Sequence, residues 1–143
     1  MTAWAGPTLT LDDCAGEPRS FEDLAGARGV LVAIGAAWCG PCQDDAPLLD
    51  AYSVANADVG VVQVLVQGAD GAPATSLACQ QWTDAFSLTH PVLIDPVFVT
   101  EPIAGDEGFP IHVVYSAAGA QLYWAAGAFD AEEVDAAFAD ASP

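Results

Sequence analysis

The sequence contains no lysine, and its only cationic side chains besides two histidines are Arg19 and Arg28. Against them stand 20 acidic residues, so the 143-residue chain carries a formal net charge of −18. A field of this sign repels nucleic acid and anionic membrane surfaces, and we expect neither as a partner. The acids are scattered, which is typical of a solvated surface suited to solubility or high salt. A basic protein partner stays open as a second explanation.

Long apolar stretches are also missing. No hydrophobic run approaches the ~20 residues that a membrane-spanning helix needs, so we expect no membrane insertion. Residues 1–4 lack the basic region and apolar core of a signal peptide, which fits a cytoplasmic protein or a mature domain without its leader. There is no internal repeat. A chain of this length with 53% hydrophobic content predicts a single domain over residues 1–143.

Cysteine is scarce, and the four cysteines lack the spacing of a zinc site. Cys39 and Cys42 form one Cys-x-x-Cys pair, whereas a structural zinc site usually needs a second pair or two spaced histidines. We therefore expect no metal. The even count leaves Cys14 and Cys79 as each other's only disulfide partners, and such a bridge would indicate an oxidising compartment. Two unconnected buried thiols are the alternative.

The most informative segment is 38–42, which reads Trp-Cys-Gly-Pro-Cys and follows the apolar run 30–34. The run predicts a buried strand, and the composition of residues 43–56 predicts a helix. At such a junction the first sulfur lies at the helix N-terminus, where unpaired N–H groups and the dipole favour a thiolate. We expect Cys39 to be the exposed nucleophile and Cys42 the more buried resolving thiol of a thiol–disulfide exchange. A purely structural disulfide is the alternative.

Most of the remaining chain alternates predicted strands and helices. The predicted strands cover residues 9–11, 59–66, 92–94, 111–115 and 121–126, and the predicted helices cover 20–24, 74–88 and the residues after Asp130. A β-α-β unit needs parallel strands and a hairpin needs antiparallel ones, so the sheet must be mixed. Residues 95–109 hold glycines, prolines and acids and predict a loop near the cysteine pair.

Segment 38–42 resembles the active site of the thioredoxin superfamily. Pro47 lies where thioredoxins carry a helix-kinking proline, and residues 109–115 resemble the family's cis-proline segment. Residues 89–95 are similar to a stretch of the broader peroxiredoxin (AhpC/TSA) and TlpA-like group. The resemblance extends over about residues 9–138. It implies an α/β thioredoxin fold, with a central mixed β-sheet flanked by helices and a short N-terminal extension.

The resemblance also implies a proton acceptor. Asp45 lies three residues after Cys42, where TlpA-like proteins usually carry a glutamate, and its carboxylate is the candidate acceptor for the Cys42 proton. An ordinary exposed helix acid is the alternative. Thioredoxins proper carry a buried aspartate on the preceding strand, where this chain has Ala33, and this favours the TlpA-like assignment. His112 is expected to be an ordinary strand residue.

Five residues are implied as the substrate-binding surface. Trp38 is expected to cover the active site, and the Phe109–Pro110 bond is expected to be cis and to lie beside Cys39. The exposed backbone of that loop would pair with an extended substrate. Gly40 and Pro41 match the dipeptide of reducing thioredoxins, and Pro41 fits a first helical turn because its missing N–H needs no partner there.

We therefore expect a monomeric thiol–disulfide oxidoreductase that reduces protein disulfides with electrons from an unidentified donor. Its redox group is the Cys39–Cys42 pair, and we expect no separate cofactor. The nearby acids and the absence of a cation predict a Cys39 pKa of about 7 or above. A thioredoxin-fold peroxidase and a redox-silent interaction module are the alternatives. We expect a periplasmic or secreted location, with the cytoplasm as the alternative.

Overall fold

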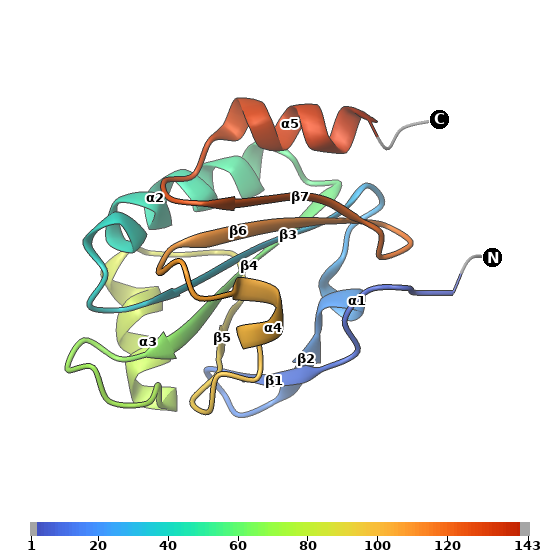
Figure 1. Cartoon of the computed structure of the whole chain (residues 1–143). Coiled ribbons are helices and arrows are strands. Elements are labelled where there is room, and N and C mark those ends of the chain that lie inside the picture. The colour runs from blue at the N-terminus through green and yellow to red at the C-terminus, as the bar shows by residue number, and fades with distance from the viewer. Residues whose placement is uncertain (1–2, 141–143) are drawn as a thin grey trace.

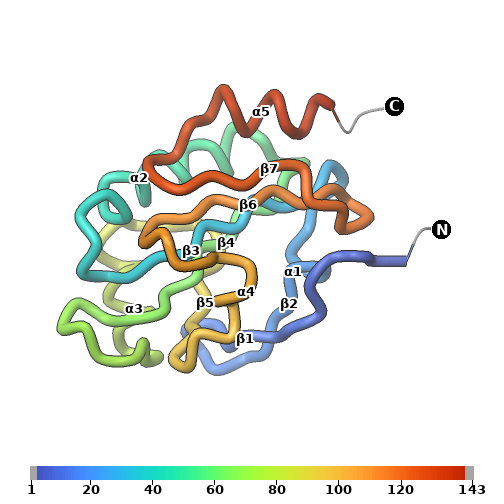
Figure 2. The backbone as a smooth tube through the Cα atoms, in the orientation of Figure 1, coloured from blue at the N-terminus to red at the C-terminus, as the bar shows by residue number. Residues whose placement is uncertain are grey.

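The computed structural model describes residues 3–140, so the outermost residues of the expected domain, 1–2 and 141–143, lie outside the described residues. Its centre is a seven-stranded sheet in the order β2-β1-β5-β4-β3-β6-β7 (Figures 1 and 2). The strands are β1 (Thr10–Asp13), β2 (Pro18–Ser20), β3 (Gly29–Ala36), β4 (Val59–Gln67), β5 (Val92–Ile94), β6 (Ile111–Ser116) and β7 (Gln121–Ala126). β4 pairs in parallel with β3 and β5, and the other neighbours are antiparallel. The mixed sheet predicted from the sequence is confirmed.

Helices cover both faces of this sheet (Figure 1). They are α1 (Phe21–Leu24), α2 (Gly40–Ala55), α3 (Ser76–Ala85), α4 (Glu101–Ala104) and α5 (Ala131–Asp140). Two begin with the side-chain caps that the sequence predicts. Ser20 Oγ accepts the N–H of Asp23 at 3.1 Å, and Asp130 Oδ1 accepts the N–H of Glu133 at 3.1 Å. Each cap satisfies one backbone donor that the first turn leaves without an intrahelical partner.

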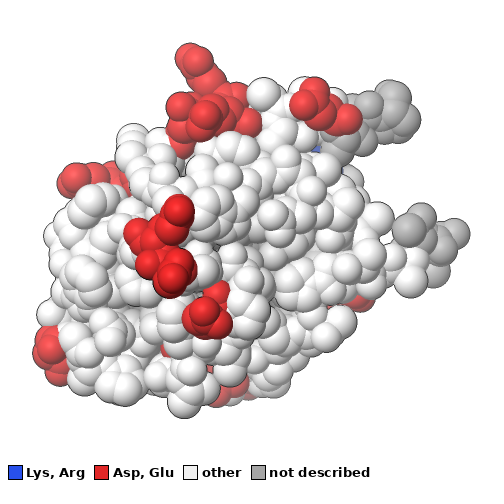
Figure 3. Space-filling view, viewed as in Figure 1, with Lys and Arg blue, Asp and Glu red and all other residues white. Residues whose placement is uncertain are grey.

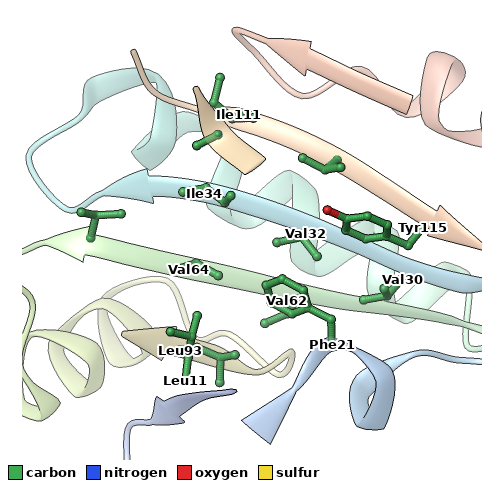
Figure 4. Close-up of a cluster of buried hydrophobic side chains, with 13 residues drawn as sticks. Leu11, Phe21, Val30, Val32, Ile34, Val62, Val64, Leu93, Ile111 and Tyr115 are labelled. Atoms are coloured by element: carbon green, nitrogen blue, oxygen red, sulfur yellow. The ribbon is translucent and has the colours of Figure 1, made fainter. Parts of the chain in front are cut away.

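β3 is buried along its whole length because both of its faces are covered. Val30, Val32 and Ile34 pack into a cluster with Phe21 and Tyr115, on the side of α1 and α4 (Figure 4). The alternate residues of β3 face the opposite side, where they pack against α2 and α5. Burial on both faces explains why this strand is a continuous apolar run in the sequence instead of an alternating one. The run ends at the cysteine pair.

Two local elements differ from the sequence prediction. Residues 95–109 were expected to be a loop, but they contain α4, a single turn whose entry is fixed by Asp95. The Asp95 carboxylate accepts the N–H and the hydroxyl of Thr100, at 2.9 and 2.5 Å. A turn this short shows no helical periodicity in the sequence. The predicted strand 9–11 is followed by a second short strand, β2, that was not predicted. α2 begins at Gly40, so Cys39 lies at its N-terminus and Pro41 in its first turn, as the sequence predicts.

The acidic side chains form separate groups on the molecular surface (Figure 3). Arg19 lies 3.2 Å from Asp13 and Arg28 lies 3.7 Å from Asp58, so both arginines are engaged in surface ion pairs. Pairs of this kind contribute little to stability, typically about 0–1 kcal/mol. None of the described helices is long and apolar enough to cross a membrane.

Candidate active site around the Cys39–Cys42 disulfide

The two cysteines lie where β3 passes into α2. Cys39 is the N-cap of α2, and its Sγ accepts the backbone N–H of Cys42 at 3.2 Å. Pro41 lies in the first turn, where its missing N–H needs no partner. The cysteines form a disulfide with a Cα–Cα distance of 5.2 Å. The strand-to-helix junction therefore brings both sulfurs to the N-terminus of a 16-residue helix.

The expectation that Cys39 is the more exposed of the two cysteines is wrong for this disulfide form. Both residues are only 3% exposed. The disulfide turns the Cys39 sulfur toward Cys42, and both side chains join an apolar cluster against which Phe109 packs. The exposed residues of the segment are Trp38, Gly40 and Pro41. A reacting partner therefore contacts these exposed residues before it contacts either sulfur.

Trp38 lies on the surface beside the disulfide and is not a core aromatic. Its side chain is 50% exposed, and its Nε1 donates a hydrogen bond to Gln67 Oε1 at 2.7 Å. Its ring centroid lies 6.4 Å from that of Phe109, which in turn lies 5.9 Å from that of Phe98. Three aromatic rings therefore form a row along one side of the cysteine pair.

The Phe109–Pro110 bond is cis. The Pro110 carbonyl accepts the N–H of Gly127 at 2.9 Å, which ties this loop to the end of β7. Pro110 is buried and lines the same small cavity as Cys42. The loop before β6 thus lies beside the disulfide, as the resemblance implied.

Asp45 is buried, so the alternative of an exposed helix acid is wrong. Its side chain is 3% exposed, and Oδ2 accepts the N–H of Phe129 at 3.1 Å. Burial raises the pKa of Asp45 above its ordinary value, the Phe129 hydrogen bond opposes that rise, and the neighbouring Asp44 adds to it. Asp45 and Cys42 line one cavity of about 10 Å³. A carboxyl group whose pKa is raised next to a reacting thiol is suited to proton transfer.

His112 is the residue of this site that the sequence analysis missed. It lies on β6, is 1% exposed, and its Nε2 has no hydrogen-bond partner among the described residues. Asp45 Oδ2 lies 3.5 Å from that nitrogen. Burial lowers the pKa of His112 to about 4, and a backbone hydrogen bond at Gly127 opposes this shift. The one signal in the sequence is an ionisable side chain inside the otherwise apolar run 111–114.

Cys14 and Cys79 form the second disulfide, with a Cα–Cα distance of 5.2 Å. Cys14 follows β1 and Cys79 lies on α3, so the bridge ties the end of this strand to a helix. Cys79 is fully buried. The structure therefore has the pairing that the even cysteine count left open. Among the described residues, no group of three or more histidines, cysteines and acids is placed to hold a metal ion.

Gly35 gives Cys42 the space that it needs. A Cβ added at Gly35 would lie 2.6 Å from the Cys42 sulfur, well inside contact distance. We expect Gly35→Ala to displace this sulfur and to slow reduction of the disulfide by dithiothreitol about tenfold or more, because small misplacements of reacting atoms are costly. Stopped-flow Trp fluorescence measures the rate. Gly68→Ala is the matched control because its Cβ would make only ordinary contacts. Equal rates for wild type and Gly35→Ala would contradict the prediction.

Comparisons with known proteins agree with this geometry. The chain is 31% identical over 90 residues to "Thioredoxin-like protein YneN" of Bacillus subtilis, which covers 62% of this chain and 51% of that protein. It is 42% identical over 52 residues to a thioredoxin of Alicyclobacillus acidocaldarius, which covers 36% of this chain and 45% of that protein. The chain thus spans about half the length of these two relatives.

Solved structures share the fold. A secreted Mycobacterium tuberculosis disulfide oxidoreductase, described as homologous to Escherichia coli DsbE, has a TM-score of 0.73 and 22% identity, covering 92% of this chain and 95% of that one. The exposed lipoprotein thioredoxin Etrx1 of Streptococcus pneumoniae has a TM-score of 0.76 and 19% identity, covering 92% and 98%.

The sequence model of the AhpC/TSA family matches residues 4–100 of this chain. This range is about two thirds of the chain and includes β1 to β5 with both disulfides. The match, the thioredoxin fold and the Cys-x-x-Cys pair at the start of α2 agree with one another. The chain therefore belongs to the AhpC/TSA family, within the thioredoxin superfamily.

Proposed function

We propose that this protein is a thiol–disulfide oxidoreductase that reduces protein disulfides through Cys39 and Cys42. The observation that carries the proposal is the Cys39–Cys42 disulfide at the N-terminus of α2, next to the cis Phe109–Pro110 bond. The reactive pair needs no further cofactor. An electron donor of the dithiol class returns the pair to its reduced form.

The reduction of a substrate disulfide consists of two consecutive thiol–disulfide exchange steps. The Cys39 thiolate attacks one sulfur of a substrate disulfide, forms a mixed disulfide with it and releases the other substrate sulfur as a thiolate, which takes up a proton. Cys42 then loses its proton and attacks the Cys39 sulfur. This second step closes the Cys39–Cys42 disulfide and releases the second substrate thiolate. Two electrons pass from the pair to the substrate.

The Cys39–Cys42 pair is proposed to act as a reductant of its substrates. A strongly oxidising pair owes its potential to a stabilised thiolate in the reduced form. Here Gln43, Asp44 and Asp45 follow the second cysteine, and no arginine or lysine lies near the pair in the sequence. The acids oppose a negative charge on Cys39. The reduced form is therefore little stabilised, which favours a reductant.

An exposed peptide segment is the proposed form of the substrate. Trp38 and Phe109 flank the disulfide with apolar surface, and Gly40 and Pro41 leave the backbone beside it open. An extended chain would pair with the backbone before Pro110 by β-augmentation. The strongly acidic surface disfavours acidic segments as substrates.

Asp45 is proposed to accept the Cys42 proton. We expect Asp45→Asn to slow disulfide reduction about 10²-fold at pH 7, within the range for a lost general base. The raised pKa of Asp45 means that this residue stabilises the fold below its ordinary value of 3.8 and that the contribution is lost as pH rises through the raised value. Urea unfolding across this window should therefore show Asp45→Asn gaining stability relative to wild type as pH rises. A constant difference would contradict it.

We also propose an extracytoplasmic location, as a single domain over residues 1–143 that acts as a monomer. The Cys14–Cys79 bridge supports the location because disulfides persist mainly in oxidising compartments. One continuous sheet that includes both β1 and β7 supports the single domain. Alkylation of the protein in its own cell, followed by mass spectrometry, tests the location, since a bridge found reduced there would overturn it.

The proposed activity is tested by insulin reduction with dithiothreitol as electron donor. We expect turbidity from the free insulin B chain to develop faster with the protein than with dithiothreitol alone. Hydrogen peroxide consumption is measured beside it, because family membership makes a peroxidase the second candidate. Peroxidases of this group place Thr three residues before the attacking cysteine, and this chain has Ala36 there. Peroxide turnover without insulin reduction would favour the peroxidase, and neither activity would favour a redox-silent module.

A further inference from the structure

The cavity beneath the disulfide brings together residues that are distant in the chain. Cys42 and Asp45 reach it from α2, Pro110 from the loop before β6, and His112 from β6 itself. Its volume is about 10 Å³, close to the space of one water molecule. His112 lies opposite Ala33 in the β3–β6 register, so a small side chain on β3 faces it across the pair of strands. The side chains of Asp45 and His112, which line this cavity, are both buried.

Asp45 and His112 face each other in this cavity. Oδ2 of Asp45 lies 3.5 Å from Nε2 of His112, and their side chains are 4% and 2% exposed. A carboxylate oxygen and a bare imidazole nitrogen both present lone pairs, which repel at this distance unless one of the two atoms carries a proton. An unpartnered buried nitrogen is costly, and the Asp45 oxygen is the polar atom that faces it.

The titratable groups that face His112 are Asp45 and Cys42, because its other neighbours carry no ionisable side chain. β3 and β7 present Ala33 and Ala125 in register with it, and the segment before α5 places the Phe129 ring 5.7 Å away. β4 contributes the uncharged Gln63 to the cavity wall. Asp44 acts one step further out, through its charge on Asp45.

We propose that Asp45 and His112 form one buried pair that holds the proton released by Cys42. This inference rests on the proposed exchange at Cys39 and Cys42. When Cys42 attacks the mixed disulfide, its proton passes to Asp45 Oδ2, and His112 Nε2 stabilises it there by accepting a hydrogen bond. When a donor thiolate later opens the Cys39–Cys42 disulfide, the same proton returns to the Cys42 sulfur. His112 is thus a positioning residue that acts through Asp45.

The environment favours the neutral members of the pair. Burial raises the pKa of Asp45 and lowers that of His112 to about 4, so both shifts act against a charged pair. An ion pair is disfavoured in this buried site. Removing two charges from water costs more free energy than their attraction in a poor geometry supplies. In the proposed pair the proton lies on Asp45 Oδ2 while the disulfide is closed, and His112 Nε2, 3.5 Å away, faces it.

The proposal is tested by counting protons at equilibrium. The protein is equilibrated with reduced and oxidised dithiothreitol between about pH 5.5 and about pH 7.5, below ordinary thiol pKa values. The redox state of Cys39 and Cys42 is read by alkylation and mass spectrometry of a peptide that contains both, so the second disulfide does not interfere. On reduction the stored proton passes to Cys42 and one proton of dithiothreitol passes to Cys39, so the second dithiothreitol proton enters the solvent. The equilibrium constant should therefore rise about tenfold per pH unit toward the reduced protein.

The decisive variant is His112→Gln, which keeps a polar side chain of similar length. We expect its equilibrium constant to be nearly independent of pH in the same range, because Asp45 without its partner no longer retains the proton. Asp45→Asn and the double variant should behave like His112→Gln, since residues that act as a unit are not additive. Tyr115→Phe is the control because this buried residue of β6 packs into the cluster on the opposite face of the sheet. It should keep the wild-type slope.

The outcomes separate this inference from the proposed function. A pH-independent equilibrium in the wild type, or an unchanged slope in His112→Gln, overturns the proton-holding pair even if the protein reduces insulin. A wild-type slope of tenfold per unit that His112→Gln abolishes supports the pair even if insulin is not reduced, because the equilibrium needs no protein substrate. Should His112→Gln fail to fold, His112→Asn and the Asp45→Asn slope decide the same question.

Discussion

Replacing Cys39 with serine is expected to abolish disulfide reduction, with a loss of about 10³-fold or more in the insulin assay. The hydroxyl of serine is not ionised at neutral pH and is a poor nucleophile toward sulfur, so the first exchange step has no attacking group. The side chain is buried and is similar in size, so the fold should persist, which circular dichroism verifies. Activity of Cys39→Ser within tenfold of wild type would contradict the assignment of the nucleophile.

The variant Cys42→Ser should behave differently. It retains the attacking sulfur and lacks the resolving one, so a mixed disulfide between Cys39 and the substrate should accumulate. Non-reducing gels and mass spectrometry identify the trapped species. If instead Cys39→Ser traps substrate on Cys42 and Cys42→Ser does not, the roles of the two cysteines are reversed. Because both cysteines are equally buried in the disulfide form, the trapping experiment decides what exposure cannot.

Removal of the second disulfide is expected to have the largest effect on stability. The double variant Cys14→Ala/Cys79→Ala opens a loop with a sequence separation of 65 and should lose about 4 kcal/mol of unfolding free energy in the chain-entropy model. Chemical denaturation of the oxidised proteins measures the loss. The matched control is Cys39→Ala/Cys42→Ala, whose sequence separation of 3 predicts a smaller loss of about 2 kcal/mol. Equal losses would show that loop length does not govern the effect.

The sequence predicts the order of the elements well because β3 and β4 are long apolar runs with strong turn signals around them. It predicts the face of α2 poorly. Apolar Leu48 has a side chain that is 53% exposed, whereas the carboxyl residue Asp45 on the same helix is buried. The reason is tertiary. α2 directs Asp45 toward the segment before α5 and toward β6, and neither lies near α2 in the chain.

Some residues of the candidate site could likewise be predicted from the sequence and others could not. The Cys39–Cys42 pair could be predicted because its chemistry lies within five consecutive residues. His112 could not, because its meaning depends on the β3–β6 register and on a nitrogen that the fold leaves without a partner. The burial of Cys39 was also missed, since the apolar cluster that contains it is built from residues distant in the chain, and Phe109 packs against it. Local motifs specify reactive groups, whereas the groups around them come from elements that only the fold brings together.

The Cys14–Cys79 bridge has a mechanical consequence. It closes a covalent ring that contains β2, β3, α2 and β4, and hence the reactive pair itself. If the chain is pulled by its two ends, the residues within this ring cannot extend, and roughly 200 Å of contour length stays hidden at up to ~3.6 Å per residue. A force-clamp trace in the oxidised state should therefore show one short extension. Added reductant should release the hidden length as a separate step, which times the cleavage of a single bond.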